Sequence, residues 1–151
     1  MNYHKDCVFV YTSAFPQIVM YKNIQIQYNK KKEVIDNMIQ DSELKNVLDK
    51  LSESLKLVYG SKLKSIILYG SVARGTATPE SDIDIMVLVD SSTEELKKYE
   101  DKLCDVSTDF ALEYFKVFSI IDVCYEEFSE WKQILPFYRN VANEGVILYA
   151  A

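Results

Sequence analysis

The stretch GSVARGTATPESDID, residues 70–84, decides the fold of this chain. It starts with Gly70 and Ser71 and ends with Asp82 and Asp84, two acidic residues separated by one position. The apolar run SIILY comes directly before it and the alternating run DIDIMVLV continues from its end, so we expect a buried strand on each side. Because alternate side chains of a strand share a face, the two carboxylates should point the same way. Two such groups repel each other unless a positive charge lies between them.

Asp122 is a third acidic residue in an apolar setting. It lies in the middle of FKVFSIIDVCY, residues 115–125, where a lone aspartate is costly to bury. Carboxylate oxygens are the ligands that Mg²⁺ prefers, so a divalent cation would hold such groups together. If the strands are neighbours, we expect all three carboxylates to converge at one end of the sheet. Asp122 alone also fits a structural ion pair with Lys116 or Arg139.

Gly70 and Ser71 supply the second half of the candidate site. Glycine lets the backbone approach a ligand closely, and the N–H groups of the turn that follows can bind an anion. The Ser71 hydroxyl adds a hydrogen bond to phosphate, and Arg74 adds a positive charge. Taken singly, these residues also fit a plain strand-ending turn, and Arg74 also fits a helix cap or a pair with Glu80. Together with the aspartates they predict a metal–nucleotide site for phosphoryl or nucleotidyl transfer.

The rest of the chain predicts an α/β fold. Apolar spacing over residues 44–58 predicts an amphipathic helix that ends at Gly60. Overlapping capping boxes at Ser91 and Ser92 predict a long helix that runs towards Tyr114. The remaining expected elements are a strand in 115–125, a short helix in 126–133, a helix from Pro136 to Gly145, and a strand in 146–149. This order predicts a small mixed β-sheet flanked by helices, in a domain of residues 41–151 that follows an N-terminal extension, residues 1–40, without a clear period.

The composition limits the function classes. The net charge is −6 and the pI is about 4.8, so we expect no direct binding to nucleic acid, which requires a basic face. Three cysteines without any short spacing indicate free thiols in the cytoplasm and no disulfide framework. The most apolar early run is too short for a membrane span, and no secretory signal is expected. Since His4 is the only histidine, acid–base chemistry falls to carboxylates.

The chain resembles a known family at these residues. Gly70-Ser71, ten intervening residues and Asp82-x-Asp84 match the G-S-x10-D-x-D signature of the DNA polymerase β-like nucleotidyltransferase superfamily. Over about residues 42–150 the chain is most similar to the single-domain members, the minimal nucleotidyltransferases. Close relatives often read G-S-R-A-R-G, whereas this chain has Val72 at the first arginine of that pattern. Phosphate neutralisation would then rest on Arg74 or on a side chain of a partner.

The resemblance implies a reaction and roles for six residues. AMP would pass from ATP to a hydroxyl with two Mg²⁺ ions bound, and pyrophosphate would be released. The resemblance gives metal binding and catalysis to three aspartates and nucleotide binding to three other residues: Asp82, Asp84 and Asp122 for the metals, and Gly70, Ser71 and Arg74 for the nucleotide.

The resemblance also implies a partner. This core has no room for a separate acceptor-binding domain, so we expect the acceptor site to come from a second copy of the chain, as a homodimer, or from another protein. Minimal nucleotidyltransferases commonly pair with a helical HEPN-domain protein in toxin–antitoxin modules. The expected function is that of an antitoxin that adds AMP to a tyrosine of a HEPN ribonuclease toxin. The alternatives are a non-catalytic antitoxin that acts by binding, and a nucleotidyltransferase of small molecules such as aminoglycosides.

Overall fold

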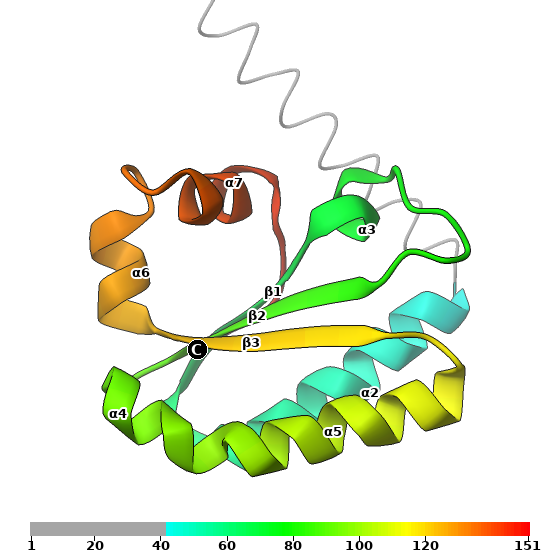
Figure 1. Ribbon diagram of the computed structural model, residues 1–151, viewed down its shortest axis with the longest axis horizontal. Helices are drawn as coiled ribbons and strands as arrows, with labels where there is room; N and C mark the ends of the chain where they lie inside the picture. Colours follow the sequence, from blue (N-terminus) through cyan, green and yellow to red (C-terminus); the bar gives the residue numbers. More distant parts are fainter. Residues whose placement is uncertain (1–41) are drawn as a thin grey trace, which may run out of the picture. The chain divides into compact units, whose positions relative to one another are not determined.

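The computed structural model describes residues 42–151, and the extension predicted for residues 1–40 lies outside this range. Figure 1 shows the elements in colour along the chain. In chain order they are α2 (Ser42–Tyr59), η1 (Gly60–Lys62), β1 (Leu63–Tyr69), α3 (Gly70–Arg74), β2 (Ile83–Val89), α4 (Thr93–Leu96), η2 (Lys97–Tyr99), α5 (Glu100–Tyr114), β3 (Phe118–Cys124), α6 (Tyr125–Trp131), α7 (Pro136–Glu144) and β4 (Val146–Ala150).

The strands form one mixed sheet in the order β3-β2-β1-β4. β1 pairs antiparallel with both β2 and β4, whereas β2 and β3 are parallel neighbours. A parallel pair needs a crossover connection, and α4, η2 and α5 provide it. The prediction of a small mixed sheet flanked by helices is therefore confirmed. The two aspartate-bearing strands are neighbours, which the sequence left open.

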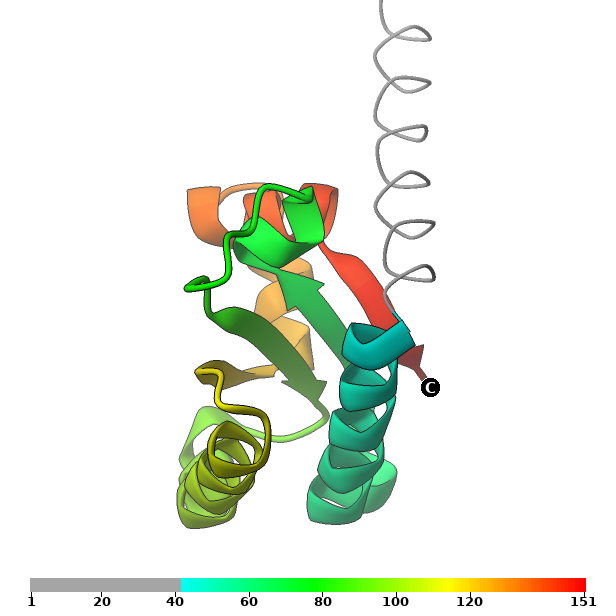
Figure 2. The same cartoon turned by 90° about the vertical axis from the view of Figure 1, so that its right-hand side faces the viewer.

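Helices cover both faces of this sheet. α2 and α5 lie on one face, and α6 and α7 lie on the other, with α3 next to α7 at the end of β1 (Figures 1 and 2). β2 is buried along most of its length because its alternate residues pack into two separate cores. Ile85 and Val87 pack towards α2 and α5, while Met86 and Leu88 pack towards α6 and α7.

The local sequence explains where the helices begin and end. The predicted first helix is confirmed as α2, and its buried stripe contains Leu48, Leu51 and Leu55 at helical spacing. Gly60 follows it with φ +55°, a left-handed conformation that ends a helix. No helix within residues 42–151 is long and apolar enough to cross a membrane.

The predicted long helix before Tyr114 is interrupted. It starts as predicted, since the Ser92 side chain accepts a hydrogen bond from the Glu95 N–H and caps α4. A 3₁₀ turn, η2, then separates α4 from α5, and the Tyr99 ring in that turn packs against the Tyr59 ring with centroids 4.8 Å apart. α5 ends where Phe115 takes φ 53°, so the strand predicted from residue 115 begins only at Phe118.

Candidate nucleotidyl-transfer site

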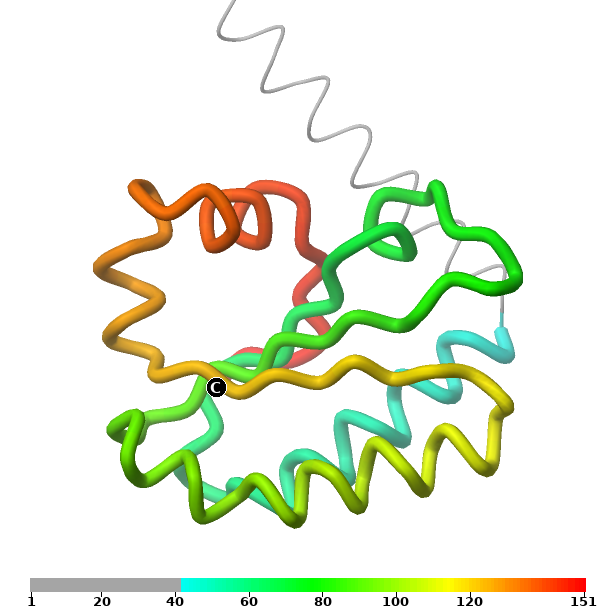
Figure 3. The backbone as a smooth tube through the Cα atoms, in the orientation of Figure 1, coloured from blue at the N-terminus to red at the C-terminus, as the bar shows by residue number. Residues whose placement is uncertain are grey.

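The turn between β1 and α3 brings the two halves of the predicted motif together. Figure 3 follows the chain from α3 through the loop of residues 75–82 and back along β2. Gly70 has φ +71°, which favours glycine, and a Cβ atom there would collide with the Oδ2 atom of Asp84. The glycine therefore allows the Asp84 carboxylate to lie directly against the start of α3, where Ser71 follows.

Asp84 and Asp82 are near neighbours, as predicted. Asp84 pairs with Tyr69 on β1 and with Ser119 on β3, and it is partly buried, whereas Asp82 precedes β2 and is exposed. Burial raises the pKa of the Asp84 carboxyl, the negative charge of Asp82 raises it further, and the positive charge of Arg74 opposes both effects. The two carboxylates are therefore close enough for the charge of Asp82 to raise the pKa of Asp84.

Arg74 stands in the last turn of α3 and connects this helix to α7. Its Nη1 atom lies 3.5 Å from the Oε2 atom of Glu144, in a half-exposed ion pair. Glu144 is thus the partner that the structure gives to Arg74, in place of Glu80. The positive charge of Arg74 also lowers the pKa of Asp84, so Arg74 lies near the Asp84 carboxylate as well as near Glu144.

Asp122 does not join the other two aspartates, and the expected convergence of three carboxylates is wrong. Ser119 is the β3 residue that pairs with Asp84, and Asp122 lies three positions further, opposite Val87. An odd number of positions along a strand leads to the opposite face of the sheet. Asp122 therefore faces the α2 and α5 layer, where it accepts a 2.9 Å hydrogen bond from the Tyr59 hydroxyl.

The surroundings of Asp122 are those of a structural residue on the rim of a groove. Burial raises its pKa, the hydrogen bond from Tyr59 lowers it, and the charge of Glu100 raises it. It lines a cavity of about 560 Å³ along α5 together with Glu100, Cys104 and Ser107. Neither Lys116 nor Arg139 forms an ion pair with it in the described part of the chain; Lys116 donates instead to the Pro79 carbonyl, at 3.1 Å.

Tyr69 is a residue of the site that the sequence prediction missed. It pairs with Asp84 across β1 and β2, and burial and the charge of that carboxylate both raise the pKa of its hydroxyl. Its ring meets the Phe137 ring of α7 edge to face, with centroids 5.6 Å apart. Its position directly before Gly70 was a usable signal, because that position places it at the end of β1 beside the turn.

The residues present fit a divalent cation in part. Asp82 and Asp84 present carboxylate oxygens where β2 begins. Because the two carboxylates repel each other and the pKa of Asp84 is raised, a cation between them would stabilise their charged forms. Within residues 42–151, however, no cluster of three or more acidic, cysteine or histidine side chains is arranged to hold a metal. A metal at this site would therefore take its remaining ligands from substrate phosphates and water, as Mg²⁺ commonly does.

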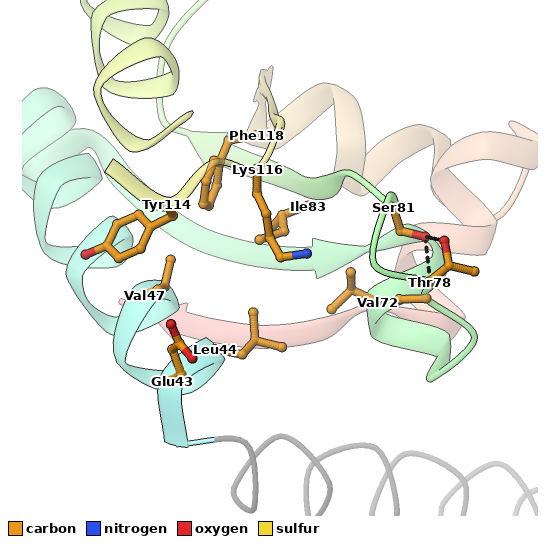
Figure 4. A pocket seen from close by; sticks show the side chains of 11 residues that line it. Glu43, Leu44, Val47, Val72, Thr78, Ser81, Ile83, Tyr114, Lys116 and Phe118 are labelled. Carbon is orange, nitrogen blue, oxygen red and sulfur yellow. Dashed lines mark hydrogen bonds between the residues drawn. The ribbon is translucent and has the colours of Figure 1, made fainter. Parts of the chain in front are cut away.

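A separate pocket lies behind the turn. It has a volume of about 310 Å³ and is lined mainly by apolar side chains, among them Val47 of α2, Val72 of α3, Ile83 of β2 and Phe118 of β3 (Figure 4). Ile83 and Phe118 belong to the core on the α2 side. This pocket is therefore on the opposite side of the sheet from the Asp84 carboxylate.

The chain is similar to known nucleotidyltransferases. Residues 44–147 match the family model described as a nucleotidyltransferase domain. A Methanocaldococcus jannaschii protein named "putative protein adenylyltransferase" is 41% identical over 96 residues, which cover 64% of this chain and 88% of that protein. A second protein of that organism with the same designation is 34% identical over 111 residues, covering 74% of this chain and 75% of the relative.

Some solved structures with a similar chain are toxin–antitoxin complexes. A chain of a toxin–antitoxin crystal structure with AMP-PNP is 21% identical, with a TM-score of 0.45 over 68% of this chain and 73% of that chain. A chain from the complex of a tri-AMPylated Shewanella oneidensis HEPN toxin with an MNT antitoxin is 19% identical, with a TM-score of 0.43 over 70% and 71%. The family match, residues 44–147, covers α3 and the strands β1 and β2 on either side of it. The chain therefore belongs to the nucleotidyltransferase domain family.

Proposed function

We propose that this chain is a Mg²⁺-dependent protein adenylyltransferase that transfers AMP from ATP to a hydroxyl group of a partner protein. The observation that carries the proposal is the close approach of Gly70 to the Asp84 carboxylate, which supports a phosphate-binding role for the backbone of the turn and a metal-binding role for Asp84. Relatives named as protein adenylyltransferases support a protein as the acceptor.

The reaction that we propose forms one bond and breaks one bond. The acceptor hydroxyl oxygen attacks the α-phosphorus of ATP and forms an oxygen–phosphorus bond, while the bond from that phosphorus to the bridging oxygen breaks. Pyrophosphate leaves with the bonding electron pair, and the hydroxyl proton passes to a carboxylate of the site or to water. When bound, Mg²⁺ would supply charge stabilisation for the phosphates and for the leaving pyrophosphate.

The protein residues have separate roles in this proposal. The backbone after Gly70 and the Ser71 hydroxyl would bind the β- and γ-phosphates, and Arg74 would offset part of their charge. Asp82 and Asp84 would hold the metal. The metal-binding role expected for Asp122 is not part of the proposal, because that side chain lies on the other face of the sheet.

We further propose that the partner is a HEPN-domain ribonuclease toxin, that a tyrosine is the residue modified, and that the chain acts as its antitoxin in the cytoplasm. The resemblance of the motif to minimal nucleotidyltransferases supports this pairing. The net charge of −6 suits a basic RNA-cutting partner. The three cysteines have no short spacing, which supports a reducing compartment such as the cytoplasm.

The test is the intact mass of a purified HEPN-domain protein from the same genome after incubation with this chain, ATP and Mg²⁺. We expect a gain of one or more AMP units, which disappears when the Asp82→Asn/Asp84→Asn variant replaces the wild-type chain. A stable complex without any mass gain would favour a non-catalytic antitoxin. Neither a gain nor a complex would favour small-molecule hydroxyl acceptors such as aminoglycosides.

A further inference from the structure

The connection between α6 and α7 and the adjoining ends of these helices expose several apolar side chains. Within seven residues of sequence, four large apolar residues are substantially exposed: Trp131 (38%), Ile134 (62%), Leu135 (40%) and Phe137 (46%). Scattered exposed apolar residues are normal on a protein surface, whereas a contiguous group of this kind marks an interaction site. We call this group the 131–137 patch.

The patch adjoins the candidate site. Phe137 packs its ring against Tyr69, and Tyr69 pairs with Asp84 across the two central strands. The Arg74–Glu144 ion pair holds the far end of α7 against α3. Figure 1 shows α3, α6 and α7 on the same side of the sheet, and the view in Figure 2 agrees. A protein bound on the patch would therefore extend over the end of the sheet where β2 begins and the aspartates lie.

We propose that the 131–137 patch is the docking surface for the protein that accepts AMP, and that this acceptor presents an apolar anchor within a basic surface. The inference deepens the proposed function and rests on it. A protein adenylyltransferase must orient a protein hydroxyl at the α-phosphate of its nucleotide, and contacts next to the reacting centre supply that orientation.

Charge at the patch selects a basic partner. Outside the Arg74–Glu144 ion pair, residues 125–145 contain three glutamates, namely Glu126, Glu127 and Glu130, and two basic residues, Lys132 and Arg139. Glu126 and Glu130 are exposed on α6, and Asp82 is exposed at the start of β2. An apolar centre with an acidic rim is complementary to an apolar anchor surrounded by lysine or arginine, and like charges around such an anchor are unfavourable.

The patch alone is too small for a stable interface, and its charge favours a different protein over a second copy of this chain. At about 200 Å² for each large side chain, the exposed fractions amount to roughly 400 Å² of surface. A stable interface buries about 800 Å² on each partner. Any interface on the patch alone therefore falls short of that area, and the partner must also bury neighbouring surface, as an acceptor that reaches the aspartates would. A second copy would bring its own acidic rim against this one, whereas a basic acceptor would complement it.

Ile134 offers the cleanest test, because its side chain is the most exposed of the four and lies between α6 and α7. We expect Ile134→Glu to raise the KM for the HEPN-domain protein at least about tenfold, by placing a charge in the apolar centre of the interface. Binding of a fluorescent ATP analogue should stay unchanged. The matched control is Leu112→Glu on α5, which is 71% exposed on the opposite layer and should leave both quantities unchanged.

Calorimetric binding of the same HEPN-domain protein, without ATP, separates failure of the docking proposal from failure of the proposed function. If wild type binds but does not transfer AMP and Ile134→Glu does not bind, the patch is the docking surface and the proposed activity is wrong. If Ile134→Glu and Leu135→Glu bind and react like wild type, the docking proposal is overturned. It is also overturned if sedimentation shows a wild-type dimer that Ile134→Glu dissociates, because the patch would then join two copies of the chain.

Discussion

Asp122 and Asp84 lie on neighbouring parallel strands but face opposite sides of the sheet. Asp84 pairs with Ser119, and the three positions from Ser119 to Asp122 reverse the direction of the side chain. Tyr59, from the helix that covers the far face, donates a hydrogen bond to Asp122. The carboxylates available to a nucleotide at the turn are therefore Asp82 and Asp84, and Asp122 belongs to the packing of the opposite layer.

The first prediction concerns Asp122→Asn. We expect this variant to keep the rate of AMP transfer within about threefold of wild type, since losing a metal ligand costs several kcal/mol of charge stabilisation and Asp122 is not placed to be one. The asparagine oxygen still accepts the hydrogen bond from Tyr59, so the free energy of unfolding should change by less than about 1 kcal/mol. Single-turnover transfer and urea unfolding measure the two quantities.

Tyr59→Phe is the companion to that variant. It removes the donor and leaves the half-buried Asp122 carboxylate without this hydrogen bond, at a cost of about 1–3 kcal/mol. We expect lower stability with transfer unchanged at a temperature where the variant is folded. A large loss of transfer in either Asp122→Asn or Tyr59→Phe, with the fold intact by circular dichroism, would return Asp122 to the catalytic machinery.

The sequence could predict most of the fold and part of the site, for reasons that differ between residues. Gly70, Ser71, Asp82 and Asp84 belong to one continuous stretch, so their proximity follows from a strand, a turn and a strand. Asp122 lies on another strand, and its face depends on a parallel register that no local pattern specifies.

Local sequence patterns also could not predict the ion pair of Arg74 or the 3₁₀ turn in the crossover connection between β2 and β3. The pairing of Arg74 with Glu144 requires α7 to lie beside α3, which follows from packing and not from spacing. The same holds for η2, where the ring of Tyr99 packs on that of Tyr59 and the chain leaves the α-helical path that its capping boxes predict.

Gly70→Ala tests the contact on which the proposed function rests. The added methyl group would both strain a backbone with φ +71° and displace the Asp84 carboxylate. We expect transfer to fall by about 100-fold or more, since the metal ligand moves by the order of 1 Å. Gly60→Ala is the matched control, because Gly60 has φ +55° but open space around it. It should lose about 1–2 kcal/mol of stability and retain transfer; equal losses of transfer in both variants would show that backbone strain alone is responsible.

Asp84→Asn should separate metal binding from folding. The raised pKa of Asp84 means that the folded state holds this proton more tightly than the unfolded state does. Protonation of this carboxyl therefore stabilises the folded state at low pH, and that contribution is lost as the pH rises through the folded-state pKa. Over this range, the free energy of unfolding of wild type should fall relative to that of Asp84→Asn. We expect the variant to be at least as stable as wild type at pH 7 in EDTA.

Mg²⁺ should reverse this order of stability. Because a cation that binds only the folded state stabilises it by mass action, added Mg²⁺ and an ATP analogue should raise the melting temperature of wild type more than that of Asp84→Asn. Differential scanning fluorimetry with and without EDTA measures the effect. Identical metal responses in the two proteins would remove Asp84 from the metal site.

The last prediction distinguishes the two residues of the pair between α3 and α7. Arg74→Ala removes the positive charge that we assign to phosphate binding, so the KM for ATP should rise about tenfold, the loss expected for a charge-assisted hydrogen bond. Glu144→Gln removes the competing carboxylate and leaves Arg74 in place, so the KM for ATP should stay equal to or below that of wild type. Because the pair is half-exposed, neither change should alter the free energy of unfolding by more than about 1 kcal/mol. An equal rise of KM in both variants would mean that the ion pair acts by holding α3 in position, and that Arg74 does not meet the phosphates.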